Sequence, residues 1–107
     1  MKTKNTVAEA RRSAKKQQEF LQKVYEYEKS HGRNIVRYDH GDFVWCNELR
    51  TFRVCFGLTQ TQLANIVGVS KNTISLYEQS KQIPSLQIGL RIGQLFRVTP
   101  RFLFWEE

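Results

Sequence analysis

Residues 57–81 read GLTQTQLANIVGVSKNTISLYEQSK and contain two short amphipathic segments joined at Gly68. Thr59 can cap the first segment and Ser70 the second, because a hydroxyl oxygen at a helix start accepts a free backbone N–H. Apolar residues recur at helical spacing along both segments: Leu63, Ala64, Val67, Val69, Ile74 and Tyr77. A turn this short holds its two helices at a steep, fixed angle, so the second can enter a DNA major groove. The stretch therefore predicts a helix-turn-helix.

Three further short helices are predicted around this pair. Residues 47–56 have apolar positions on one face, and residues 85–96 follow a proline, with three leucines expected to point inward: Leu86, Leu90 and Leu95. Thr99 begins a last helix with Pro100 at its first position, where the missing N–H of proline costs nothing. Residues 46–107 are thus predicted to form an all-α, five-helix DNA-binding domain.

Residues 1–45 form a separate N-terminal segment in this interpretation. Residues 5–31 contain no Pro or Gly and are rich in Ala, Lys, Gln and Glu, which predicts a long helix. The apolar stripe strengthens after residue 17, so residues 18–30 are expected to be firmly helical and residues 1–15 frayed. The turn sequence Asp39-His40-Gly41-Asp42 lies between two β-prone runs, which fits either a short hairpin or an irregular linker.

Composition restricts the classes of protein that this chain can belong to. The 107 residues carry a net charge of +7, and residues 1–18 hold six Lys or Arg against one Glu. A basic chain favours an acidic polymer such as nucleic acid as its partner. The sequence has no apolar run long enough to span a membrane and no signal-peptide pattern, so a cytoplasmic protein is expected. Cys46 and Cys55 have no metal-binding spacing and are expected to be free thiols.

The stretch from Trp45 to Trp105 resembles the Cro/repressor (XRE-type, lambda-repressor-like) helix-turn-helix family. Matching residues occur at the family's mutual spacing over about sixty positions: Leu49, Arg53, Gly57-Leu58-Thr59-Gln60, Leu63-Ala64, Gly68-Val69-Ser70, Thr73-Ile74, Tyr77-Glu78, Lys81, Pro84-Ser85-Leu86, Val98-Thr99 and Leu103-Phe104. The resemblance implies a sequence-specific transcriptional regulator of double-stranded DNA, acting as a repressor. Two positions depart from the family pattern: Ser80 and Arg97 stand where a glycine usually follows a helix.

Four residues face outward near the start of the second helix of the pair: Lys71, Asn72, Ser75 and Leu76. These are the positions at which the family reads base edges. Lysine donates to guanine, and asparagine can bond adenine through two atoms at once. Serine suits either base, and an exposed leucine can contact a thymine methyl. The alternative for Leu76 is packing against the preceding helix.

The resemblance also assigns residues that hold the DNA backbone: Gln60, Thr73, Gln79 and Lys81. Gln60 lies at a helix start, where free N–H groups attract an anion. The alternative for Gln60 and Thr73 is that they are ordinary solvated surface residues. Arg53 and Glu78 are expected to form a partly buried salt bridge between the first helix of the domain and the recognition helix.

The apolar C-terminus is predicted to bind a second copy of this chain. Phe102, Phe104 and Trp105 are expected at a homodimer interface, with the dimer bound to an inverted repeat. Residues 1–16 are expected to act as a basic arm, or residues 1–45 to bind a partner protein. The rival function is an antitoxin-type protein, whose N-terminal segment binds that partner while the helix-turn-helix autoregulates its operon. Neither an enzyme, a metal site nor a cofactor is indicated, because the chain has no Gly-rich phosphate loop and no metal-spaced Cys/His set.

Overall fold

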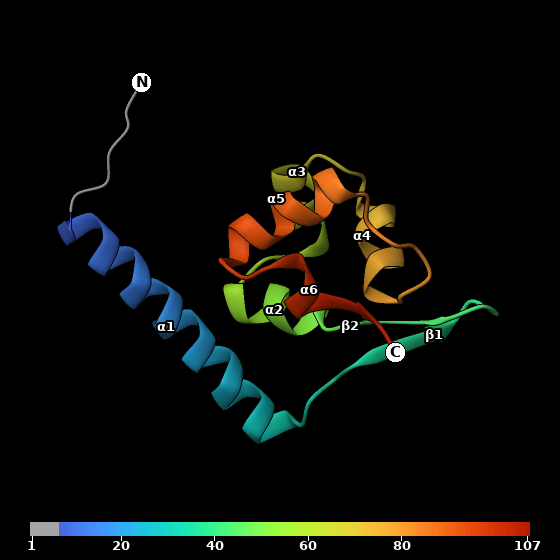
Figure 1. The fold of residues 1–107 in the computed structure, drawn as a ribbon, viewed down its shortest axis with the longest axis horizontal. Coiled ribbons are helices and arrows are strands. Elements are labelled where there is room, and N and C mark those ends of the chain that lie inside the picture. The colour runs from blue at the N-terminus through green and yellow to red at the C-terminus, as the bar shows by residue number, and fades with distance from the viewer. Residues whose placement is uncertain (1–6) are drawn as a thin grey trace.

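The computed structural model describes the backbone of residues 7–107 and the side chains of residue 16 and residues 18–107. Within that range it has six helices: α1 (Val7–His31), α2 (Leu49–Phe56), α3 (Gln60–Val67), α4 (Lys71–Glu78), α5 (Leu86–Phe96) and α6 (Pro100–Leu103). Three strands complete the fold: β1 (Val36–Asp39), β2 (Val44–Asn47) and β3 (Phe104–Glu106). Figure 1 shows α2–α6 gathered into one compact body, with α1 along one side and the strands beneath it.

The three strands form an antiparallel sheet with β2 in the centre. Tyr38 pairs with Trp45 across β1 and β2, and Cys46 pairs with Trp105 across β2 and β3. The turn between β1 and β2 is tight because Asp39 Oδ1 accepts the N–H of Gly41 over 2.8 Å, and Gly41 has a φ of 98°. The chain is therefore helix-rich, as predicted, but not all-α: residues 36–47 form the hairpin and not the linker, and the C-terminal residues supply a third strand.

Helix α1 packs on the body through its C-terminal half. Phe20 meets Phe52 edge-on at 5.8 Å between ring centroids and stacks on Phe96 at the same distance. Val24, one turn further along, is buried in the same core. The long helix predicted over residues 5–31 is thus present, and it already begins at Val7, ahead of the range expected to be firmly helical. Residues 1–6 lie outside the described part of the chain.

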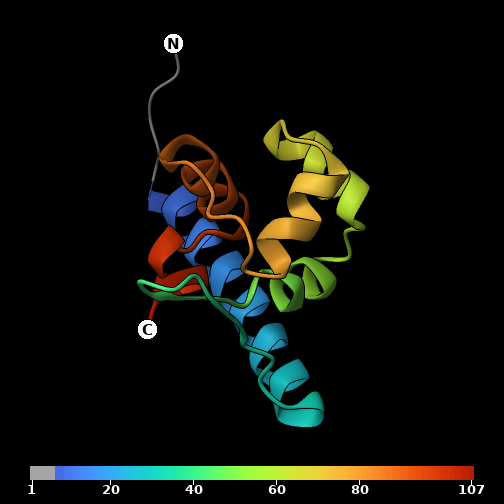
Figure 2. The ribbon, with the colours of Figure 1, turned by 90° about the vertical axis from the view of Figure 1, so that its right-hand side faces the viewer.

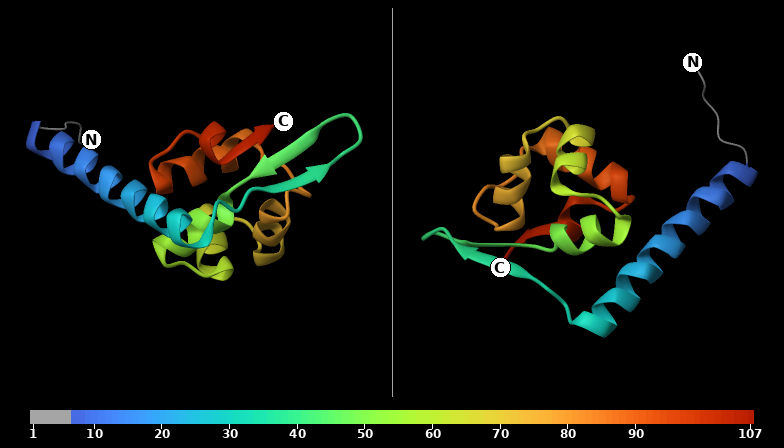
Figure 3. Two further views of the ribbon diagram at one scale, coloured as in Figure 1. Left: turned by 90° about the horizontal axis from the view of Figure 1, so that it is seen from below. Right: turned by 180° about the vertical axis from the view of Figure 1, so that it is seen from behind.

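The position of α1 relative to α4 matters for function. Figure 1 places α1 on the left of the body and α4 on the right, and Figure 2, seen from the α4 side, shows α3 and α4 in front with α1 behind. The views in Figure 3 agree, with the hairpin extending away from the body. Within the described residues, no helix is both long and apolar enough to cross a lipid bilayer.

Candidate nucleic-acid interface

The pair α3–α4 has the geometry that the sequence predicts. Thr59 caps α3 by accepting the N–H of Gln62 over 3.1 Å, and the Gln62 side chain accepts the N–H of Thr59 in return. Gly68 ends α3 in the left-handed conformation, with a φ of 84°, and Ser70 caps α4 by accepting the N–H of Thr73. Since both helix ends and the turn between them are fixed by hydrogen bonds, the angle between α3 and α4 is fixed as well.

One face of α4 is anchored in the core and the other is open. Ile74 and Tyr77 are buried against the body of the domain. Of the four residues predicted to read bases, Lys71 and Asn72 are exposed, whereas Ser75 and Leu76 are partly buried. The N-terminal turn of α4 therefore presents a long cation and an amide to solvent side by side, which is the chemistry that recognises guanine and adenine edges.

Arg53 and Glu78 form an ion pair that links α2 to the end of α4. Arg53 Nε lies 2.6 Å from Glu78 Oε2, and both side chains are almost fully buried. Arg53 also donates to the Leu58 carbonyl over 2.8 Å, and Gln60 Nε2 donates to Glu78 Oε1 over 3.1 Å. Three elements are thus held together by one carboxylate, which fixes the position of α4 on the body.

The residues assigned to phosphate contacts are placed unevenly. The Gln60 side chain is held by Glu78, so only its position at the start of α3 remains as an anion-binding feature. Thr73 shares a hydrogen bond with the Ser70 hydroxyl, and Gln79 donates to Ser75 Oγ over 2.9 Å. The ammonium of Lys81 lies 5.8 Å from the ring centre of Tyr38 in β1. Exposed amide and ammonium groups therefore continue from α4 into the loop that follows it.

Ser80 and Asn47 form a buried contact beneath this surface that the sequence does not predict. Ser80, which stands where the family usually has glycine, has a φ of 60° and is completely buried. Asn47 Nδ2 donates to Ser80 Oγ over 2.6 Å. No local pattern could have revealed this contact, because the two residues are 33 positions apart. Arg97, the second departure, also adopts the left-handed conformation, with a φ of 59°.

The predicted dimer cluster is divided by the third strand. Phe104 is only 6% exposed and packs edge-on against Tyr77, so it belongs to the core and its assignment to a dimer interface is wrong. Trp105 is partly buried in β3, beneath the guanidinium of Arg33. Phe102 remains 52% exposed. The C-terminus thus leaves one of its three predicted interface residues open.

The exposed apolar surface lies on α5 instead. Leu86 is 77% exposed and Leu90 is 48% exposed, although both were expected to point inward. They lie one turn apart, so they share one face of the helix. An apolar groove follows beside them, lined by Ile83, Pro84 and Pro100 among others. Two large exposed side chains next to such a groove are typical of an interaction surface.

Two carboxylates meet where α1 joins the body. Burial, and then a hydrogen bond with Glu48, raise the pKa of Glu28 to about 7. Burial also opposes ionisation of Glu48, but hydrogen bonds with Arg33 and Glu28 outweigh it and lower the Glu48 pKa. Arg33 Nη2 lies 2.7 Å from Glu48 Oε1. Glu28, at the contact that fastens α1, therefore loses its proton at a higher pH than an ordinary carboxyl.

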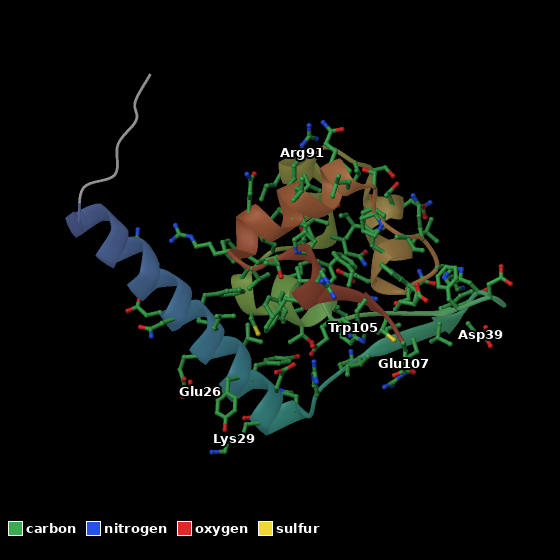
Figure 4. All side chains as sticks on the ribbon, in the orientation of Figure 1. Glu26, Lys29, Asp39, Arg91, Trp105 and Glu107 are labelled. Atoms are coloured by element: carbon green, nitrogen blue, oxygen red, sulfur yellow. The ribbon has the colours of Figure 1, made fainter. Side chains whose placement is uncertain are left out.

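Figure 4 shows how the remaining charged side chains are placed. Glu26 and Lys29 point outward from α1, away from the body, and Asp39 lies at the hairpin tip. Arg91 lies at the top of α5, where its guanidinium donates to the last carbonyl of α3, that of Val67, over 3.0 Å.

Among the side chains that the structure describes, no group of three His, Cys, Asp or Glu is placed to hold a metal ion. Both cysteines are free, as expected, and both are buried.

Comparison with known proteins shows that the helical part of this chain is similar to helix-turn-helix transcriptional regulators. The sequence profile described as helix-turn-helix matches residues 49–103. An uncharacterized HTH-type transcriptional regulator of Archaeoglobus fulgidus is 39% identical over 61 residues, which cover 55% of this chain and 87% of the relative. The uncharacterized HTH-type transcriptional regulator YgzD of Bacillus subtilis is 33% identical over 61 residues, covering 57% of this chain and 92% of the relative. No solved structure matches the chain at comparable significance.

Proposed function

The chain belongs to the helix-turn-helix family of transcriptional regulators, and we propose that it is a repressor that reads double-stranded DNA through α4. The observation that carries this proposal is the exposed first turn of α4, with Lys71 and Asn72 open to solvent on a helix whose other face is buried. A recognition helix needs both properties, because base edges are read only by free side chains held in a fixed register.

Lys71 and Asn72 are the principal base readers in this proposal. Ser75 contributes a hydroxyl, and the partly buried Leu76 offers the edge of its side chain to a thymine methyl. Backbone phosphates are held by the start of α3 at Gln60 and by three groups along α4 and beyond it: Thr73, Gln79 and Lys81. Such contacts fix the register of the helix on the duplex without specifying sequence.

The DNA-bound form is proposed to be a two-fold homodimer. The α5 face with Leu86 and Leu90 supports this, because a second copy would cover apolar side chains that one chain leaves in water. Phe102 adds a further exposed aromatic ring. The operator is then an inverted repeat whose half-sites are centred about 34 Å apart, roughly one turn of the DNA helix.

The placement of α1 supports a second candidate function. Because α1 lies on the far side of the body from α4, it can bind a partner protein while α4 is on DNA. This is the arrangement that an antitoxin-type regulator requires. The same placement argues against a basic arm along the duplex that α4 contacts. Residues 1–6, which include Lys2 and Lys4, lie outside the described range.

Selection of bound duplexes from a random DNA library tests the proposed function. The purified chain is expected to enrich one inverted repeat, with the spacing given above. A motif without two-fold symmetry would reject the homodimer. No enrichment by the chain alone, but enrichment once a co-purifying protein is added, would favour the antitoxin-type function. No enrichment under either condition would overturn the proposal.

A further inference from the structure

The hairpin β1–β2 is joined to the end of α4 through Ser80. The Ser80 hydroxyl donates to the carbonyl of Val36 in β1 over 2.7 Å and accepts from Asn47 Nδ2 in β2 over 2.6 Å. The Ser80 carbonyl accepts a hydrogen bond from His40 Nε2 over 2.8 Å. Ser80, which follows the recognition helix, therefore contacts both strands of the hairpin and its turn. We call this set of contacts the Ser80 junction.

Asn47 extends the Ser80 junction to two helices. Its amide nitrogen also donates to the carbonyl of Glu78 at the end of α4, over 3.2 Å, and its side-chain oxygen accepts the first N–H of α2, from Leu49, over 2.8 Å. Asn47 is completely buried, and each polar atom of its side chain has a partner. A buried network with all its groups paired holds its members in one geometry.

The conformation of Ser80 makes the serine itself informative. Its φ of 60° lies in the left-handed region, which glycine adopts without steric cost and other residues adopt under strain. The helix end could therefore be formed more easily by glycine. A serine at this position is explained by its hydroxyl, which forms two buried hydrogen bonds to the hairpin that glycine cannot form.

The hairpin also contacts Lys81 directly, in the loop that follows α4. The ring of Tyr38 in β1 lies beneath the ammonium of Lys81, at 5.8 Å. His40 at the turn meets Tyr38 edge-on at 4.9 Å and stacks on Phe43, which orders the ring that faces Lys81. Lys81 N donates to the Leu76 carbonyl over 3.0 Å, so the backbone of this residue is fixed as well. Side chain and backbone of Lys81 are thus both held, the first by the hairpin and the second by α4.

We propose that the β1–β2 hairpin is a positioning element for DNA binding, which acts through Ser80 and Tyr38 to hold Lys81 against a backbone phosphate. The proposal rests on the DNA-binding function proposed above. The profile match begins at Leu49, so this element precedes the shared helix-turn-helix region. Ser80 and Tyr38 are positioning residues: they act on the phosphate contact of Lys81 and read no base themselves.

The salt dependence of operator binding tests this proposal on the full chain. The logarithm of the association constant falls linearly with the logarithm of the salt concentration. Losing one phosphate contact makes this slope shallower by about 0.9. Lys81→Gln is expected to show this loss, and Tyr38→Leu and Ser80→Ala are expected to lose most of the same amount. Tyr38 is at the surface, so Tyr38→Leu keeps the test valid if Ser80→Ala folds poorly. Val24→Ala, a core change in α1, is the control for lost stability and should keep the wild-type slope.

Two further comparisons decide the cause. The double variant Lys81→Gln with Tyr38→Leu should show a slope no shallower than that of Lys81→Gln alone. Both changes act on the same phosphate contact, which can be lost only once. Ser80→Gly should behave like Ser80→Ala if the hydroxyl matters, and like wild type if only the backbone conformation does; the latter result would reject the role of the serine. Wild-type slopes for both Tyr38→Leu and Ser80→Ala, with an operator bound normally by wild type, would overturn the proposal and leave the DNA-binding function intact. Failure of wild type to prefer any DNA would instead reject that function.

Discussion

Arg53 Nε donates to Glu78 Oε2 over 2.6 Å, and this contact fastens the end of the recognition helix to the first helix of the domain. Both side chains are buried, so removing one partner leaves an unpaired charge away from water. Arg53→Gln is expected to lower the free energy of unfolding by about 3–5 kcal/mol.

The chain contains a matched control for this change. Arg37 and Glu107 form an ion pair over 3.0 Å with both side chains about half exposed. Arg37→Gln removes the same kind of charge from a solvated pair, which costs less than about 1 kcal/mol. Urea unfolding of both variants checks the prediction, and equal losses for the two would contradict the account of Arg53.

Stability is expected to depend on pH through the Glu28–Glu48 pair. The pKa of Glu28 is raised from 4.5 to about 7, so the folded state binds a proton that the unfolded state releases between these values. Stability contributed by protonated Glu28 is therefore complete below pH 4.5 and is lost as the pH rises through about 7. Glu48, with its pKa lowered, contributes in the opposite direction and loses its part in acid.

Glu28→Gln separates these contributions because glutamine stays neutral at every pH. The variant is expected to be more stable than wild type at pH 8, by roughly 1–2 kcal/mol, which is less than full linkage because Glu28 is partly solvated. Its unfolding free energy should change little between pH 6 and pH 8, while that of wild type falls. Glu26→Gln, an exposed change on the same helix, is the control. A wild-type decline that persists in Glu28→Gln would place its origin elsewhere.

The exposed leucines of α5 are expected to form the dimer contact. Leu86→Glu places a charge where the second copy would pack, so the variant should sediment as a monomer at tens of micromolar while wild type sediments as a dimer. Its stability as a monomer should be nearly unchanged, because Leu86 is mostly exposed. Tyr25→Glu changes another mostly exposed residue, which lies on α1, and is expected to leave the dimer intact. A monomeric wild type, or a dimeric Leu86→Glu, would exclude this interface.

Local sequence patterns are sufficient to predict the helix-turn-helix. They do not predict contacts between residues that lie far apart in the sequence. Thr59, Ser70 and Gly68 mark helix ends through bonds to residues a few positions away, so their roles can be deduced from sequence. The Arg53–Glu78 pair needed the family resemblance, since its members are 25 positions apart.

The C-terminal strand shows why the remaining features were missed. Residues 104–106 form β3 only by pairing with β2, nearly sixty positions earlier, and their apolar composition fitted an interface equally well. The contacts of Ser80 with Val36 and Asn47 likewise depend on how the hairpin folds back beneath α4. The raised pKa of Glu28 likewise arises only because α1 docks on the body. Each of these features depends on tertiary packing that no short stretch encodes.

The most direct test of base reading by α4 is a repeated operator selection with Asn72→Ala. An amide that bonds adenine through two atoms discriminates against other bases by about 1–3 kcal/mol, and alanine cannot do so. The variant is expected to enrich the same inverted repeat, with the preference for adenine lost at one position in each half-site. An identical motif for wild type and Asn72→Ala would show that Asn72 reads no base, and would remove the main support for base reading by α4.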